Sequence, residues 1–261
     1  MRKTKNGKIH VIVDPNADFG KIRHRWPFFK EELSRQAGEA FTHFISKEFS
    51  VEACVREAMR AGAKTVVVFG GDSALHFAVN CLMQYPESDR PNLGVFSSSV
   101  YAQGFFNSLA PESIAMSQAA RMELAVRMVA HGRPSAIDLG IAKFETEPGA
   151  SQQRYFINLA SYGISPKIIE ALPDMDHALH SGLSFIAASA KALLQYRAAK
   201  ISVKAKEKII FPKQAIFNFF VANGSFGPAA MRSSPAADLC DGKLDCLILP
   251  DAPVAEWMME M

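Results

Sequence analysis

The architecture of this 261-residue chain follows from one stretch, Thr65-Val-Val-Val-Phe-Gly-Gly-Asp-Ser-Ala-Leu75. Its first five residues are β-branched or aromatic, which predicts a short buried strand over 65–69. Two glycines and an aspartate interrupt the strand, and a helical apolar pattern follows from Ser73 to Met83. A strand that turns directly into a helix presents unpaired backbone N–H groups at the positive helix end, which suits a phosphate. A tight turn that binds no ligand is the alternative.

The two glycines of this turn, Gly70 and Gly71, have a physical reason to be glycine if a phosphate binds there. A Cβ atom would hold the anion away from the backbone, and turns of this kind often require a positive φ. A phosphate at this turn would therefore explain why both positions are glycine.

Strands and helices alternate on both sides of this stretch. Strands are predicted over 9–13, 40–45 and 92–96, and helices over 27–36 and, after the capping residue Ser50, over 51–61. Alternation at these lengths is typical of a parallel sheet with helices on its faces. Ligands of such sheets bind at the carboxyl ends of the strands, where both glycines, Asp72 and Ser97 fall.

The pattern changes after a long helix that is predicted to begin at Pro111 and to end before Gly132. Strands are predicted beyond it over 135–142, 154–160, 201–206, 215–222 and 244–249, with helices only near 166–172 and 183–196. Runs of strands without alternating helices favour an antiparallel sheet. We therefore divide the chain into an α/β domain at 1–130 and a β-rich domain at 131–261.

The composition excludes several classes of protein. With 49% apolar and 21% charged residues and a net charge of +3, the chain is globular and gives no indication of a nucleic-acid partner. The four cysteines form no C-x-x-C pair, which favours reduced thiols in a cytoplasmic protein. The basic start has no apolar segment behind it, and no stretch approaches membrane-spanning length. We expect at most peripheral membrane contact.

Six short motifs occur in a fixed order along the chain. They are Val13-Asp-Pro15, Gly70-Gly-Asp-Ser-Ala74, Ile137-Asp-Leu-Gly140, Tyr155-Phe-Ile-Asn-Leu-Ala160, Ala222-Asn-Gly-Ser-Phe-Gly227 and Pro235-Ala-Ala-Asp-Leu-Cys-Asp-Gly-Lys-Leu-Asp245. The series resembles the diacylglycerol kinase catalytic-domain family, which includes sphingosine kinases and bacterial lipid kinases and shares its fold with NAD kinases. Several weak motifs in order are more specific than any one of them. The resemblance implies a Rossmann-like nucleotide-binding domain followed by a mainly antiparallel β domain.

The resemblance also implies site residues, with ATP at the glycine turn and a lipid hydroxyl in a cleft between the domains. Nucleotide binding is expected of Gly70, Gly71, Asp72, Ser73, Ser99 and Asn223. Asp138 is implied as a catalytic acidic residue, and an aspartate satisfied by backbone N–H groups is the alternative. Asp241 is implied as a Mg²⁺ ligand, although a plain turn explains Asp241-Gly242 equally well. Asn223-Gly224 is likewise a common turn pair.

The chain departs from the family pattern in four places, the first of which is Asp14 where the family has an asparagine after its first strand. The Gly-Thr pair after the aspartate is Ser73-Ala74 here, and the family's Gly-Thr-x-Asn-Asp loop appears as Ser99-Val-Tyr-Ala-Gln103. Family members carry the catalytic base in a later Asp-Gly-Glu turn, and this chain contains no Asp-Gly-Glu. A general base typically contributes about 10²–10⁴-fold to the rate. A family member without one would keep its binding sites and lose most of its catalysis.

The function predicted from these motifs is a divergent ATP-dependent lipid kinase. The alternatives are a catalytically impaired family member that binds nucleotide or lipid, and a soluble-substrate kinase of the NAD kinase type. The second domain lacks the usual C-terminal return, so we expect an unpaired strand edge near 244–249. Together with the apolar Trp257-Met258-Met259, this edge predicts a homodimer or a chain cut from a longer product.

Overall fold

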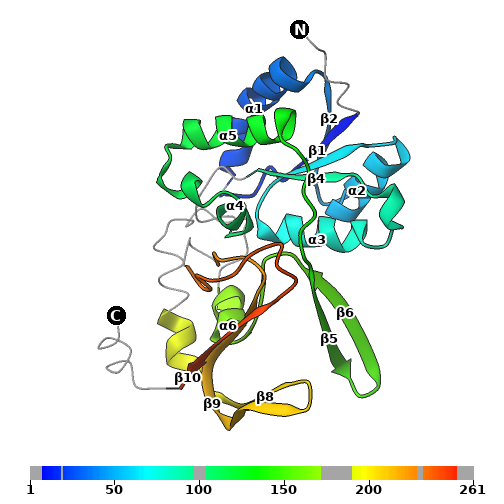
Figure 1. Cartoon of the computed structure of the whole chain (residues 1–261). Coiled ribbons are helices and arrows are strands. Elements are labelled where there is room, and N and C mark those ends of the chain that lie inside the picture. The colour runs from blue at the N-terminus through cyan, green and yellow to red at the C-terminus, as the bar shows by residue number, and fades with distance from the viewer. Residues whose placement is uncertain (1–7, 19, 97–103, 172–189, 228–231, 252–261) are drawn as a thin grey trace. The chain divides into compact units, whose positions relative to one another are not determined.

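The structure is a computed structural model that describes residues 8–18, 20–96, 104–171, 190–227 and 232–251 (Figure 1). Its contacts define two compact units. The first unit comprises Met1–Asn158 and Asn223–Lys243, and the second comprises Leu159–Ala222 and Leu244–Met261. The bounds of these units differ from the division expected after residue 130. That division stays a prediction about where the two functional domains meet.

The first unit contains a four-stranded parallel sheet in the order β2-β1-β3-β4. The strands are β1 Ile9–Val13, β2 Ala40–Phe44, β3 Thr65–Phe69 and β4 Asn92–Phe96. Strand β3 lies between β1 and β4, and four of its five residues are buried. This confirms the parallel α/β arrangement, and it explains why the Thr65–Phe69 run is apolar without alternation: both faces of β3 are covered.

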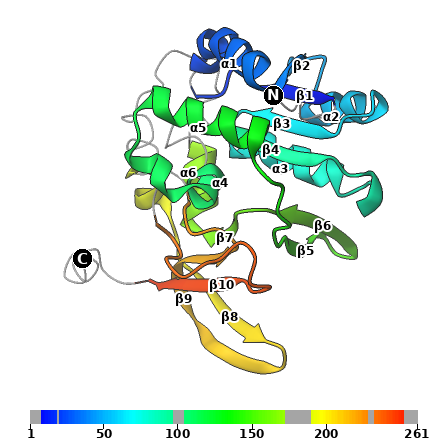
Figure 2. The same cartoon turned by 45° about the horizontal axis from the view of Figure 1, so that its top comes forward.

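Helices cover both faces of this sheet (Figures 1 and 2). They are α1 Lys21–Ala37, α2 Val51–Arg60, α3 Asp72–Leu82, α4 Gly104–Leu109 and α5 Gln118–His131, with 3₁₀ turns η1 Glu87–Asp89 and η2 Pro111–Ala115. Helices α1 and α5 share one apolar core with the sheet, and α2 and α3 share the other. Ser50 caps α2 as predicted, since its hydroxyl accepts the Ala53 N–H at 3.3 Å.

Two helix predictions were wrong in their bounds. Helix α1 begins at Lys21 and encloses Pro27, because the buried stripe that includes Trp26 and Phe29 outweighs one lost backbone hydrogen bond. The long helix expected from Pro111 is instead a 3₁₀ turn followed by α5. Ser117 starts α5 anew by accepting the Ala120 N–H at 3.3 Å.

The remaining strands are antiparallel, as predicted. In the first unit, β5 Gly140–Glu147 pairs with β6 Ala150–Phe156. The second unit holds β7 Leu159–Gly163, α6 Ile164–Ala171, β8 Ala199–Ala205, β9 Lys208–Ala222 and β10 Asp245–Pro250. The long strand β9 pairs with the other three strands of its unit. The single strand expected over 154–160 is two strands, β6 and β7, which belong to different sheets.

Strand β10 lies at an edge of its sheet, next to β9. Within the described residues it pairs with β9 alone, and the unpaired edge expected near 244–249 stays a prediction. Trp257-Met258-Met259 lies outside the described residues, and the homodimer stays a prediction. Across the part of the chain that the structure describes, no helix is both long and apolar enough to cross a membrane.

Candidate functional site

The glycine turn at the end of β3 is formed by extended backbone. Gly71 is the N-cap of α3 with φ −88° and ψ 179°, and Gly70 is not among the residues with positive φ. Neither glycine is left-handed, so a positive φ does not explain the glycines of this turn. An extended N-cap residue turns the chain from strand to helix without a positive φ. Residues other than glycine can therefore adopt the backbone conformation of Gly71.

Gly70 is required by packing rather than by conformation. A Cβ added at Gly70 would lie 3.1 Å from Ala74 Cβ and 3.2 Å from Asp14 Cβ. The Asp14 N–H donates to the Phe69 carbonyl at 2.9 Å, which holds the end of β1 against this turn. Close approach of β1 therefore accounts for Gly70 whether or not a ligand binds there.

The amino end of α3 presents unpaired donors. The first intrahelical bond runs from the Leu75 N–H to the Gly71 carbonyl at 3.2 Å, and Gly71 provides no side-chain cap. Within the described residues, the backbone N–H groups of Asp72, Ser73 and Ala74 have no hydrogen-bond acceptor. Ser73 is exposed. Three unsatisfied N–H groups at a positive helix end form an anion site in the chemical sense.

The carboxylate of Asp72 faces a neighbouring helix start. It accepts the N–H of Gly104 at 2.8 Å and that of Phe105 at 3.4 Å, so it caps α4. Burial raises the pKa of Asp72 to about 6, and the two N–H bonds act against this rise. These donors only partly offset the cost of burying the charge, so the structure shows Asp72 as the cap of α4. The predicted nucleotide residue Ser99 lies outside the described residues.

Asn223 is buried and connects three segments of the first unit. Its Nδ2 group donates to the carbonyls of Asp138 at 2.8 Å and Ile157 at 2.9 Å. Its backbone N–H donates to the Asn158 carbonyl at 2.7 Å. The Oδ1 atom is buried without a partner in the described part of the chain. The amide of Asn223 thus positions Asp138, and one acceptor remains unused.

Asp138 and Asp241 meet at one loop. The Asp138 carboxylate accepts the Gly242 N–H at 2.7 Å through Oδ2. Asp241 accepts the Lys243 N–H at 3.0 Å, and its Oδ2 lies 3.6 Å from Lys243 Nζ. Among the described residues, no three His, Cys, Asp or Glu side chains converge as a metal site. The Mg²⁺ role of Asp241 therefore stays a prediction.

Helix α4 connects the glycine turn with the Asn223 group. Asp72 caps its start, and Ser108 in its last turn donates to Asn158 Oδ1 at 3.2 Å. Asn158 Nδ2 in turn donates to the Phe226 carbonyl at 2.9 Å. Packing here is close, because a Cβ added at Gly104 would lie 2.8 Å from the Phe226 carbonyl oxygen. The sequence prediction missed α4 and Ser108; the only available signal was Asn158 inside a recognised motif.

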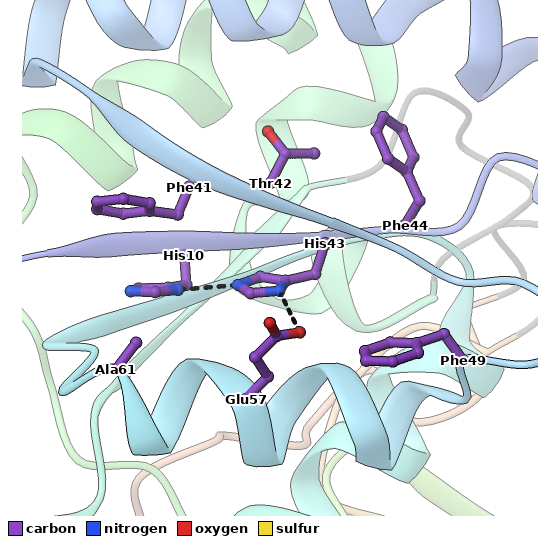
Figure 3. A pocket seen from close by; sticks show the side chains of 8 residues that line it. All are labelled: His10, Phe41, Thr42, His43, Phe44, Phe49, Glu57 and Ala61. Carbon is purple, nitrogen blue, oxygen red and sulfur yellow. Dashed lines mark hydrogen bonds and ion pairs between the residues drawn. The ribbon is translucent and has the colours of Figure 1, made fainter.

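A second cluster, His10–His43–Glu57, was also missed (Figure 3). Nδ1 of His10 lies 2.9 Å from Nε2 of His43, and Nδ1 of His43 lies 3.2 Å from a Glu57 carboxylate oxygen. These residues line a pocket of about 450 Å³ beside the edge strand β2, with Phe41 stacked on His10 at 4.9 Å. Only the register of β1 and β2 brings the two histidines together, so no local pattern could have indicated the cluster.

The hydrogen bonds of this cluster link its proton positions to one another. A neutral His43 that donates to the Glu57 carboxylate through Nδ1 accepts from His10 Nδ1 through Nε2. His10 Nε2 is then an acceptor, and it is buried without a partner in the described part of the chain. Burial lowers the pKa of His10, and His43 and Lys8 act in the same direction while Glu57 opposes them. Folded His10 therefore binds a proton less readily than an ordinary histidine does.

The lowered pKa of His10 predicts a loss of stability in mild acid. As the pH falls through 6.5, the ordinary pKa of histidine, His10 binds a proton more readily in the unfolded chain than in the folded protein. The free energy of unfolding therefore decreases. Urea unfolding between about pH 7.5 and pH 5.5 measures this slope. We expect His10→Gln to flatten the slope and the exposed-residue control His24→Gln to leave it unchanged. Equal slopes for wild type and His10→Gln would contradict the assignment.

Comparison with known proteins places these observations in a family. The model of the "Diacylglycerol kinase catalytic domain" matches residues 8–142, just over half of the chain. Among curated proteins, the chain is 30% identical over 131 residues to "Probable lipid kinase YegS-like" of Yersinia enterocolitica. This match covers 50% of the chain and 39% of that relative. A protein of the same name from Serratia proteamaculans is 30% identical over 134 residues, with 50% and 38% covered.

A solved structure extends the likeness over nearly the whole chain. The crystal structure of a diacylglycerol kinase from Bacillus anthracis superposes with a TM-score of 0.66 at 14% identity, covering 97% of this chain and 77% of that one. At this identity the comparison shows the fold alone. The matched segment spans about two fifths of the length of the curated relatives.

Proposed function

Because the chain belongs to the diacylglycerol kinase catalytic domain family, we propose that it is an ATP-dependent lipid kinase, which transfers the γ-phosphoryl group of ATP to a lipid hydroxyl. The observation that carries the proposal is the amino end of α3. Its N–H groups at Asp72, Ser73 and Ala74 have no acceptor among the described residues, and the helix dipole favours an anion there. The phosphates of ATP bind at these donors.

Helix α4 supports this phosphate site from the side. The Asp72 carboxylate accepts the N–H groups of Gly104 and Phe105 and so joins the start of α3 to the start of α4. Charge-assisted hydrogen bonds of this kind keep the two helix starts together. In the proposal, Asp72 is thus a positioning residue for the nucleotide, and Gly71 leaves the approach to the donors open.

Asp138 is the proposed acidic residue of the reaction. Its Oδ2 atom is held by the Gly242 N–H, and its backbone carbonyl is held by Asn223. Its Oδ1 atom has no hydrogen-bond partner in the described part of the chain. A carboxylate fixed through one oxygen can accept a proton from a hydroxyl through the other. Mg²⁺ has no protein cage among the described residues, and the proposed phosphate contacts do not depend on one.

A second candidate is a family member that binds nucleotide or lipid without turnover. The observation that favours it is that Asp72, Asp138 and Asp241 all accept backbone N–H groups. These bonds give each carboxylate a structural role that would persist without catalysis. The two candidates share the nucleotide site and differ only in whether a phosphorylated lipid is formed.

A kinase assay separates the two candidates. We expect the full chain, incubated with γ-labelled ATP, Mg²⁺ and a lipid extract, to transfer label into the organic phase. Asp138→Asn keeps an acceptor for Gly242 and removes the charge, so it is expected to lower the rate by about 10²–10⁴-fold. Asp238→Asn, on the adjacent loop, is the matched control and retains the rate. Bound ATP with no labelled lipid would favour the silent binder, and label in a water-soluble product would contradict the lipid substrate.

A further inference from the structure

A β-hairpin at one end of the second unit combines exposed apolar and basic side chains. Strand β8 and the first part of β9 form it, with a two-residue turn at Lys206-Glu207 (Figures 1 and 2). Ala205 pairs with Lys208, and the register shifts between Val203 and Lys204. In the described part of the chain β8 pairs with β9 alone, so no further strand covers the hairpin.

The apolar part of this surface is a pair of isoleucines near the turn. Ile209 is 55% exposed and Ile210 is 50% exposed. Further along the same strand, Ile216 and Phe220 are almost fully buried. Strand β9 therefore buries Ile216 and Phe220 in its second half and exposes Ile209 and Ile210 near the turn. Because neighbours on a strand point to opposite faces, Ile209 lies on the face of its partner Lys204, and Ile210 lies on the face of Lys208. Both faces of the hairpin end thus carry an exposed isoleucine beside a lysine, which indicates an apolar partner that receives the end of the hairpin.

The basic part of the surface surrounds these isoleucines. Five exposed lysines lie on the hairpin: Lys200, Lys204, Lys206, Lys208 and Lys213. Glu207 is the one acidic residue between them, so the segment 199–213 has a net charge of +4, more than the +3 of the whole chain. None of these lysines forms an ion pair within the described residues. Their charge is thus available to a partner.

The two parts together specify one class of partner. Isoleucines gain by leaving water for an acyl chain, and lysines can extend their ammonium groups to anionic headgroups while their stems stay apolar. A nucleic acid would use the lysines and gain nothing from the isoleucines. We propose that the β8–β9 hairpin docks the protein on bilayers that contain anionic lipid. The docking surface itself is argued from the hairpin alone. Only its purpose, to bring the kinase to a lipid hydroxyl, rests on the proposed function.

Vesicle sedimentation tests this docking surface with the full chain. We expect binding to vesicles of phosphatidylglycerol and phosphatidylcholine in equal parts, weak binding to pure phosphatidylcholine, and loss of binding as salt increases. Replacing Lys204, Lys206 and Lys208 by Gln should weaken binding about a hundredfold, since each lysine near such a surface contributes about fivefold. Ile209→Ser with Ile210→Ser should weaken it about tenfold or more.

Matched controls remove the same groups elsewhere. Lys30, Lys47 and Lys64, all exposed, are replaced by Gln to give the same change in net charge, and the 48% exposed Ile141 is replaced by Ser. Both controls should bind vesicles like the wild type. ATP binding, measured by calorimetry, should be the same in all variants, so failure of the proposed nucleotide site is read separately from failure of docking.

Each outcome either supports or overturns the docking surface, and isoleucine dependence without lysine dependence would overturn it. Selective loss of vesicle binding in the two hairpin variants supports the docking surface. Equal losses of vesicle binding in the hairpin and control lysine variants would show that binding depends on net charge alone. This result would overturn the docking surface. Lysine dependence without isoleucine dependence would indicate a purely electrostatic partner and also overturn it. Absence of vesicle binding in the wild type would overturn it directly.

Discussion

Gly71→Val is expected to weaken ATP binding by about 2 kcal/mol, or about thirtyfold, without unfolding the protein. The φ of −88° and ψ of 179° at Gly71 suit a valine, so the backbone need not change. The branched side chain would stand beside the N–H groups at the amino end of α3 and keep a phosphate from hydrogen-bond distance. Calorimetric titration with ATP measures the change in affinity.

The controls for this prediction separate steric obstruction from the loss of a polar group at the same turn. Gly71→Ala should have a smaller effect than Gly71→Val, because one methyl group obstructs less of the approach. Ser73→Ala removes a hydroxyl from an exposed position of the first helical turn and leaves every backbone donor in place. Equal ATP affinity in wild type and Gly71→Val, with thermal unfolding unchanged, would show that phosphates bind elsewhere.

Arg121→Met is expected to destabilise the protein by about 3 kcal/mol. Arg121 is 2% exposed, and its guanidinium donates to Ser113 Oγ at 2.7 Å and to Asn107 Oδ1 at 2.6 Å. It also lies 4.6 Å from the centre of the Phe106 ring. Burial lowers the pKa of Arg121 to about 10, well above neutral pH. Methionine would fill much of the volume and leave both oxygen acceptors buried without these donors.

Urea unfolding at constant pH measures this loss. Arg127→Met is the matched control on the same helix, because its side chain is 56% exposed and its contact with Glu123 is long, at 3.9 Å. We expect this control to change stability by about 0.5 kcal/mol or less. Since Arg121 joins α5 to α4, Arg121→Met should also loosen the helix that Asp72 caps. Identical unfolding midpoints for Arg121→Met and wild type would disprove the role of this network.

Much of the fold could be predicted from local patterns. The β-branched run at Thr65–Phe69 and the apolar stripe of Val51–Arg60 each have one favourable environment, a buried strand and a half-buried helix. Their alternation is enough to indicate a parallel sheet, and the ordered motifs were enough to indicate the family, which the match over residues 8–142 confirms. Helix bounds were less predictable, since Pro27 lies inside α1 and Ser117 divides the helix expected after Pro111.

The sequence by itself thus determined the strand, the turn and the helix of the glycine motif, because each depends on residues that are neighbours along the chain. Only the tertiary structure decided what those residues do. Asp72 binds the start of α4, 32 positions away, and His10 meets His43 only through the register of two strands. A hydrogen bond requires its two atoms to lie within about 3 Å, and that distance is fixed by the packing of whole elements. Local patterns specify the elements and leave such distances open.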